Sequence, residues 1–204
     1  MYAASRTPIG LLAGTTLFDV VSHRSSSWAL RGAAVLAATT ATALAAQVSI
    51  PFHPIPFTLQ PMVVLLAAAA LGSRLGATAQ LLYLAVGIAG LPVFAASATL
   101  PPGIGRLLGP TGGFLLAYPA AAFLAGWLAE RRFDRRYLTS LVAMLAGLAV
   151  VYAGGILGLA IAPPSIGLEA AARVISPYAI GDLLKLVIAA GVLPSLWKLV
   201  ARTR

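Results

Sequence analysis

Three polar side chains in the last apolar segment of the chain could bind a ligand: Tyr178, Asp182 and Lys185. Their i, i+4, i+7 spacing puts all three on one face of a helix. Ionisable groups within an apolar span are costly to bury, so they usually mark a ligand, ion or proton site. The Asp182 and Lys185 pair could instead be a structural ion pair that joins this helix to its neighbours.

The composition is that of a helical membrane protein. Of the 204 residues, 60% are hydrophobic and only 9% are charged, whereas soluble domains carry about 25% charged residues. The apolar stretches are long and continuous, which favours membrane-spanning α-helices. The chain has no cysteine, and its two histidines, His23 and His53, are isolated. We therefore expect no disulfide and no metal site.

Six apolar segments predict an all-α membrane protein, with a six-transmembrane-helix bundle in residues 28–204. The last helix is expected to begin at Ser176-Pro177, because Ser can cap a helix and Pro fits its first turn. Residues 1–27 are expected to form a mobile or interfacial cytoplasmic N-terminal extension. The six predicted spans cover residues 28–50, 57–71, 77–90, 109–129, 138–161 and 176–199.

The distribution of Lys and Arg predicts the orientation. If both termini lie on one side, that side holds eleven of the 14 basic residues, the opposite loops hold only Arg106 and Arg173, and Lys185 lies within a span. Basic residues concentrate in cytoplasmic segments, so we expect a multi-pass protein of the cytoplasmic (inner) membrane with both termini cytoplasmic. The net charge of +9 then needs no nucleic-acid partner.

This orientation places three proline-rich or glycine-rich connections on the outer side, above Asp182 and Lys185. They cover residues 51–56, 91–109 and 162–176. Long ordered loops in compact proteins usually carry function. The sequence therefore predicts a ligand pocket under outer loops.

A glycine-rich motif at the start of the fourth span could supply backbone N–H groups to a ligand. It could also be a turn that binds nothing. Arg106, just before it, could pair with an anionic ligand or anchor a lipid headgroup. The motif consists of Gly109, Pro110, Thr111, Gly112 and Gly113.

The first span carries small residues at every fourth position. Such a face lets another helix approach closely. It could serve packing within the bundle or docking of a partner. The residues are Ala33, Ala37, Ala41 and Ala45.

Catalytic residues are not expected. The chain has no G-x-x-x-x-G-K-[ST] motif, so it does not bind ATP through a P-loop. Of its five acidic residues, only Asp182 lies at membrane depth. The sequence therefore predicts a protein that is not an enzyme, and any active transport would draw on a partner or an ion gradient.

Five short motifs lie in order between about residues 30 and 200: Gln47–Pro51, Pro56–Gln60, Gly90–Phe94, Leu108–Gly113 and Gly181–Lys185. Together they resemble the biotin-specific S-component (BioY family) of energy-coupling-factor (ECF) vitamin transporters. The resemblance implies a six-helix bundle in the lipid bilayer that binds biotin and holds no cofactor. It also implies a transmembrane T-component and two ABC-type ATPases as partners, with the alanine face meeting the T-component.

Biotin has an apolar bicycle, a ureido group and one carboxylate. Asp182 can accept a hydrogen bond from a ureido N–H, and Lys185 and Arg106 can pair with the carboxylate or the ureido oxygen. Gln60 and the 109–113 backbone can make neutral hydrogen bonds. With Tyr178, these residues form the predicted biotin site.

Three alternatives stay open at this point. The chain could be an S-component for another vitamin, which a binding screen would reveal. It could be a proton-coupled secondary transporter with Asp182 as carrier, whose uptake would follow the proton gradient. It could also be a structural scaffold in which Asp182 and Lys185 only pair with each other.

Overall fold

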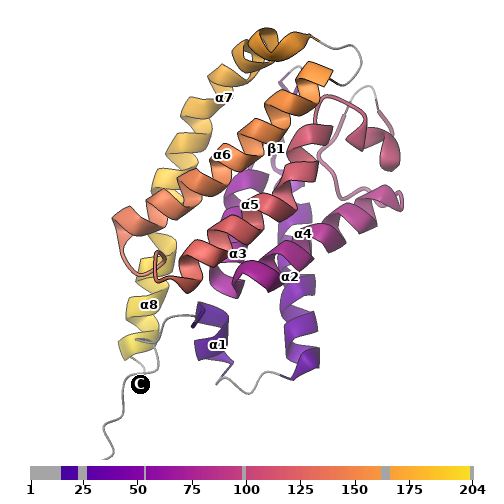
Figure 1. Cartoon of the computed structure of the whole chain (residues 1–204). Helices are drawn as coiled ribbons and strands as arrows, with labels where there is room; N and C mark the ends of the chain where they lie inside the picture. The colour runs from indigo at the N-terminus through magenta and orange to yellow at the C-terminus, as the bar shows by residue number, and fades with distance from the viewer. Residues whose placement is uncertain (1–14, 23–26, 53, 98–99, 162–165, 203–204) are drawn as a thin grey trace, which may run out of the picture.

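The computed structural model describes residues 15–22, 27–52, 54–97, 100–161 and 166–202, and its elements are almost all helical (Figure 1). The two strands form a short hairpin. In chain order the elements are α1 (Leu17–Val21), α2 (Trp28–Gln47), β1 (Ser49–Ile50), β2 (Phe57–Thr58), α3 (Gln60–Leu71), α4 (Ser73–Ile88), the 3₁₀ helix η2 (Ile104–Leu107), α5 (Gly112–Glu130), α6 (Tyr137–Ile161), α7 (Gly167–Ala189) and α8 (Val192–Arg202).

Four segments among the described residues are long and apolar enough to cross a membrane: α2, α5, α6 and the continuous stretch Gly167–Arg202, which contains α7 and α8. The second and third predicted spans correspond to the shorter helices α3 and α4. Residues 57–58, predicted to begin a span, instead form β2, which pairs antiparallel with β1. Helix α3 begins only at Gln60, with a proline in its first turn.

Helix α7 begins nine residues before the predicted start at Ser176, so residues 167–175 are helix and not loop. Pro177 lies inside the helix, where it cannot donate to the carbonyl of Arg173 four residues earlier. The Ser176 hydroxyl donates to that carbonyl at 3.0 Å. The Ser176 hydroxyl therefore replaces the backbone hydrogen bond that Pro177 cannot make. Ser176 does not cap a helix end. Residues 162–165 of the predicted loop lie outside the described part.

Helix α5 lies against α3, α4 and α6 at the centre of the bundle. It buries a row of small residues that includes Ala121, Ala122 and Ala125. Gly113 of α5 packs directly on the backbone of Gly154 and Gly158 of α6, so a side chain there would collide with the neighbouring helix. The close approach of these helices depends on small residues.

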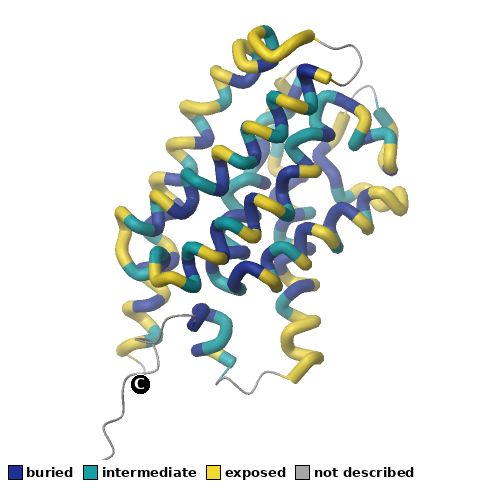
Figure 2. Tube along the Cα trace, in the orientation of Figure 1, coloured by how far each residue is buried: buried dark blue, intermediate teal, exposed yellow. Residues whose placement is uncertain are grey.

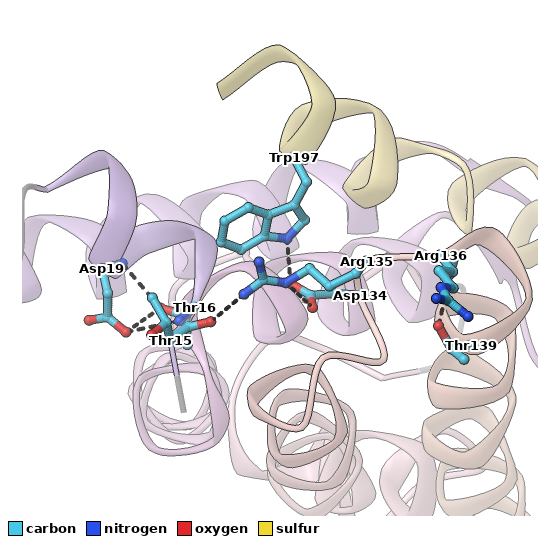
Figure 3. A network of polar contacts seen from close by, with 8 residues as sticks. All are labelled: Thr15, Thr16, Asp19, Asp134, Arg135, Arg136, Thr139 and Trp197. Carbon is cyan, nitrogen blue, oxygen red and sulfur yellow. Dashed lines mark hydrogen bonds and ion pairs between the residues drawn. The ribbon is translucent and has the colours of Figure 1, made fainter. Parts of the chain in front are cut away.

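The hairpin and the first turns of α7 lie toward one end of the bundle, and α1 and α8 lie at the other (Figure 1). At the second end, buried Asp134 accepts hydrogen bonds from Trp197 Nε1 of α8 at 2.6 Å and from Arg135 Nε at 3.0 Å. Arg135 also donates to the Thr15 carbonyl and stacks on the Trp197 ring (Figure 3). Burial raises the pKa of the Asp134 carboxyl.

This network attaches part of the N-terminal region to the bundle. Leu17 and Val20 of α1 belong to the main hydrophobic core, and Thr16 caps α1 through a capping box with Asp19. Residues 15–22 are therefore packed on the bundle, and the mobile or interfacial cytoplasmic extension expected for residues 1–27 stays a prediction. Residues 1–14 and 23–26 of that extension lie outside the described part.

Candidate functional site

Asp182 and Lys185 are brought together, as their spacing predicted. Lys185 Nζ lies 2.7 Å from Asp182 Oδ1, and Asp182 is buried on α7. The second carboxylate oxygen, Oδ2, accepts a hydrogen bond from the Tyr152 hydroxyl of α6 at 2.7 Å. Both oxygens of Asp182 thus have a partner, and each keeps a further lone pair for another donor.

Lys185 holds the hairpin against α7. Its ammonium group donates to the Thr58 carbonyl of β2 at 2.6 Å and lies 3.3 Å from the centre of the Phe57 ring. The Asp182 carboxylate and the Phe57 ring both stabilise the positive charge of Lys185 in this largely buried environment. Asp182 is thereby linked through Lys185 to the loop that precedes α3.

Asp182 lines a small cavity, here called the inner cavity, of about 50 Å³. Its walls come from the hairpin, the start of α3, the connection between α4 and α5, and helices α5, α6 and α7. Of the ten predicted site residues, five line it: Gln60, Arg106, Thr111, Tyr178 and Asp182. Lys185 contacts Asp182 without lining the cavity.

Arg106 is the most unusual residue of this wall. It is only 4% exposed, and it donates to the carbonyls of Ala95 and Leu100. Its Nε–H has no hydrogen-bond partner within the described ranges. Burial lowers the pKa of the guanidinium, although an arginine in a protein remains charged at neutral pH. Among the described residues, no carboxylate pairs with it. Arg106 is thus a buried cation without an acidic partner in the described part of the chain.

Arg106 also lines a second, outer cavity of about 260 Å³, together with Phe94 and Ala95 of the same connection. These three residues line both cavities. They form a common wall between the inner cavity and the space beyond it.

Gln60 and Tyr178 are held by internal hydrogen bonds. Gln60 Nε2 donates to the Tyr83 hydroxyl at 2.7 Å, and that hydroxyl donates to the Val93 carbonyl at 3.1 Å. The Tyr178 hydroxyl donates to the Ile55 carbonyl of the hairpin loop at 2.7 Å. The Tyr178 ring contacts Phe52 and Phe57. These contacts fix the hairpin against α7 and α3 against the 91–95 connection.

The glycine-rich motif lies beside the cavity, and only Thr111 reaches it. Gly109 packs against the Leu100 side chain, Gly112 against the backbone of Leu107, and Gly113 against α6. Pro110 does not line the cavity either. Close packing between segments explains the glycines here without a ligand.

Among the cavity-lining residues not anticipated from the sequence are two tyrosines. Tyr152 fixes the Asp182 carboxylate, and Tyr118 of α5 lines the cavity and is buried. Each is a tyrosine within a long apolar run of its helix, and that signal could have identified both. No cluster of three or more His, Cys, Asp or Glu side chains that could hold a metal occurs in the described ranges.

Packing within the bundle buries one end of the alanine face of α2 and leaves the other end exposed. Ala33 and Ala37 are exposed, Ala41 is half-buried, and Ala45 is buried within the bundle. Figure 2 shows exposed turns along α2 toward the end of the bundle where α1 lies. A partner could therefore reach Ala33 and Ala37, whereas Ala45 serves internal packing.

Residues 20–202 match the profile described as the BioY family. The chain belongs to the BioY family. Among its relatives, the "Biotin transporter BioY" of Thermotoga maritima is 38% identical over 152 residues, which cover 74% of this chain and 86% of the relative. The "Probable biotin transporter BioY" of Pyrococcus horikoshii is 44% identical over 119 residues, or 58% of this chain and 67% of that protein.

A solved structure shares the fold of this BioY family member. It is a crystal structure of the S-component for biotin from an ECF-type ABC transporter. The two structures superpose with a TM-score of 0.71 at 23% sequence identity, covering 85% of this chain and 95% of the other. The helical arrangement described above therefore resembles the fold of that S-component.

Proposed function

We propose that this protein binds biotin and imports it as the substrate-specific S-component of an ECF-type transporter, and that it is not an enzyme. The observation that carries the proposal is the match of residues 20–202 to the BioY family, whose similar members are named biotin transporters. A transmembrane T-component and two ABC-type ATPases are the proposed partners. Biotin is the transported ligand, and no cofactor is required.

The polar groups of the inner cavity suit the two ends of biotin. We assign the ureido N–H groups to the Asp182 carboxylate, which is fixed by Tyr152 and Lys185. We assign the ligand carboxylate to Arg106, whose buried guanidinium has an unpaired N–H and no acidic partner among the described side chains. Both contacts would be charge-assisted hydrogen bonds.

The inner cavity must enlarge to admit biotin. Its volume is about 50 Å³, whereas pockets for small molecules measure about 300–1,000 Å³. The outer cavity of about 260 Å³ lies on the other side of Arg106, Phe94 and Ala95. A shift of this connection would join the two spaces, which would accommodate the bicycle near Asp182 and the carboxylate chain near Arg106.

For the membrane arrangement we propose a six-helix bundle in the cytoplasmic membrane, with α3 and α4 as the two short members. Both termini and α8 would be cytoplasmic, and the hairpin and the 91–109 connection would face outward over the pocket. The bias of Lys and Arg supports this orientation.

Single cysteines test the orientation, because the chain has none of its own. Ile104 and Ala201 are both exposed, the first in η2 and the second in α8. Ile104→Cys in intact cells is expected to react with a membrane-impermeant maleimide, whereas Ala201→Cys should react only after the cells are opened. The opposite labelling pattern would overturn both the orientation and the outward position of the pocket.

The test of the function itself is an equilibrium titration of the purified protein with biotin and with other vitamins. Saturable binding of biotin alone is expected. Preferential binding of another vitamin would retain the S-component assignment and replace the ligand.

A further inference from the structure

The Tyr118 side chain of α5 lines the inner cavity and is only 3% exposed. Buried tyrosine hydroxyls usually find a hydrogen-bond partner. The hydroxyls of Tyr83, Tyr152 and Tyr178 all do so, with the Val93 carbonyl, Asp182 and the Ile55 carbonyl, respectively. Tyr118 makes no hydrogen bond with any residue in the described part of the chain.

The cavity therefore offers two complementary polar groups. Asp182 is an acceptor when ionised, and the free Tyr118 hydroxyl can donate. The cavity is small, about 50 Å³, so the residues of its wall reach a common space. A cyclic urea places N–H donors and a carbonyl acceptor side by side, which matches a carboxylate and a hydroxyl that share one small cavity.

Lys185 fits the role of carbonyl donor less well. It does not line the cavity, and its ammonium group already donates to Thr58 and Asp182 while it lies against the Phe57 ring. Gln60 donates one of its amide hydrogens to Tyr83. Within the described part of the chain the hydroxyl of Tyr118 is free, so using it for a ligand breaks no contact found there.

We propose that Tyr118 is a ligand-binding residue that determines specificity, donating its hydroxyl proton to the ureido oxygen of biotin while Asp182 accepts from the ureido N–H. This inference rests on the proposed function, since it concerns the same ligand. It assigns Tyr118, and not Lys185, to the ureido oxygen.

The test compares Tyr118→Phe with the unaltered protein for two probes. Biotin carries the ureido oxygen, whereas in iminobiotin a nitrogen that donates hydrogen replaces this acceptor. Affinities are measured by competition against labelled biotin, so that weak binding is quantified. Tyr118→Phe is expected to weaken biotin binding about tenfold, as for loss of one buried hydrogen bond. Its affinity for iminobiotin should fall less, because the Tyr118 hydroxyl can only accept from that nitrogen and has no ligand oxygen to which it can donate.

Two controls keep the result specific. Tyr178→Phe removes a hydroxyl that is bonded to the Ile55 carbonyl, so it should weaken both probes to the same extent. Tyr118→Phe without ligand should retain the melting temperature of the unaltered protein, because the hydroxyl it removes has no partner among the described residues.

Equal losses for biotin and iminobiotin, or unchanged biotin affinity, would overturn the assignment of Tyr118 alone. A lowered melting temperature without ligand would also contradict it, since that result would indicate a structural hydroxyl. Absence of biotin binding in the unaltered protein would overturn the proposed function itself. The outcomes thus separate the two claims.

Discussion

Asp182→Asn and Lys185→Ala are each expected to weaken biotin binding by about thirtyfold or more, while the protein still folds. Loss of a buried charge-assisted contact costs about 2–5 kcal/mol, which sets that scale. Asp182→Asn removes the negative charge that would accept from the ureido group. Lys185→Ala removes the ammonium group that fixes Asp182 and holds Phe57 and Thr58 of the hairpin.

A purely structural ion pair predicts a different pattern. Breaking a buried pair leaves an unpaired charge, so each single change would lower the free energy of unfolding, and the double change would restore much of it. A binding site remains inactive in the double variant. Melting temperature and biotin affinity, measured on both singles and the double, distinguish these cases.

The same helix supplies a matched control. Glu169 and Arg173 form an ion pair on α7, but both side chains are about four-fifths exposed. Exposed pairs contribute little to stability. Glu169→Gln should therefore leave biotin affinity unchanged. Full biotin affinity in a well-folded Asp182→Asn, Lys185→Ala double variant would remove both residues from the site.

Ala37→Trp is expected to abolish most biotin uptake by the assembled transporter while leaving biotin binding by the isolated protein intact. Ala37 is exposed on α2, where an indole would prevent the close approach of a T-component helix. Uptake by cells that carry all components, and binding by the purified chain, are the two measurements.

Two further tryptophan variants of α2 make this result specific. Leu36 is exposed but points about 100° away around the helix, so Leu36→Trp should retain uptake. Ala45 is buried within the bundle, so Ala45→Trp should damage folding and binding together. Normal uptake by Ala37→Trp would show that the exposed alanines are not the docking surface.

Contacts within one helix could be predicted from spacing alone. The ion pair of Asp182 and Lys185 joins residues three apart, so the helical period was enough to place them together. Their partners Thr58 and Tyr152 come from other parts of the chain. Such contacts depend on how α6, α7 and the hairpin pack, which periodicity does not specify.

The start of α7 shows where local signals mislead. Ser176-Pro177 has the composition of a helix start, yet the helix continues through it because the Ser176 hydroxyl occupies the carbonyl that Pro177 leaves free. Gly109, Gly112 and Gly113 show the same ambiguity. Glycine permits both ligand approach and segment packing, and here packing against Leu100, Leu107 and α6 accounts for them.

The role of Arg106 could be predicted only in part from the sequence. The sequence predicted that it lies in an outer loop, and the alternatives were a lipid anchor or an anion partner. Its burial and its unpaired Nε–H appear only in the folded chain, and they favour the anion partner.

Calorimetric titration of the purified protein in detergent measures whether this chain binds biotin by itself. The protein should first be freed of any copurified ligand by partial unfolding and refolding. One saturable biotin site per chain is expected, with no comparable signal for other vitamins. A folded protein that gives no saturable signal with biotin would overturn the proposal that this chain is a biotin-binding protein.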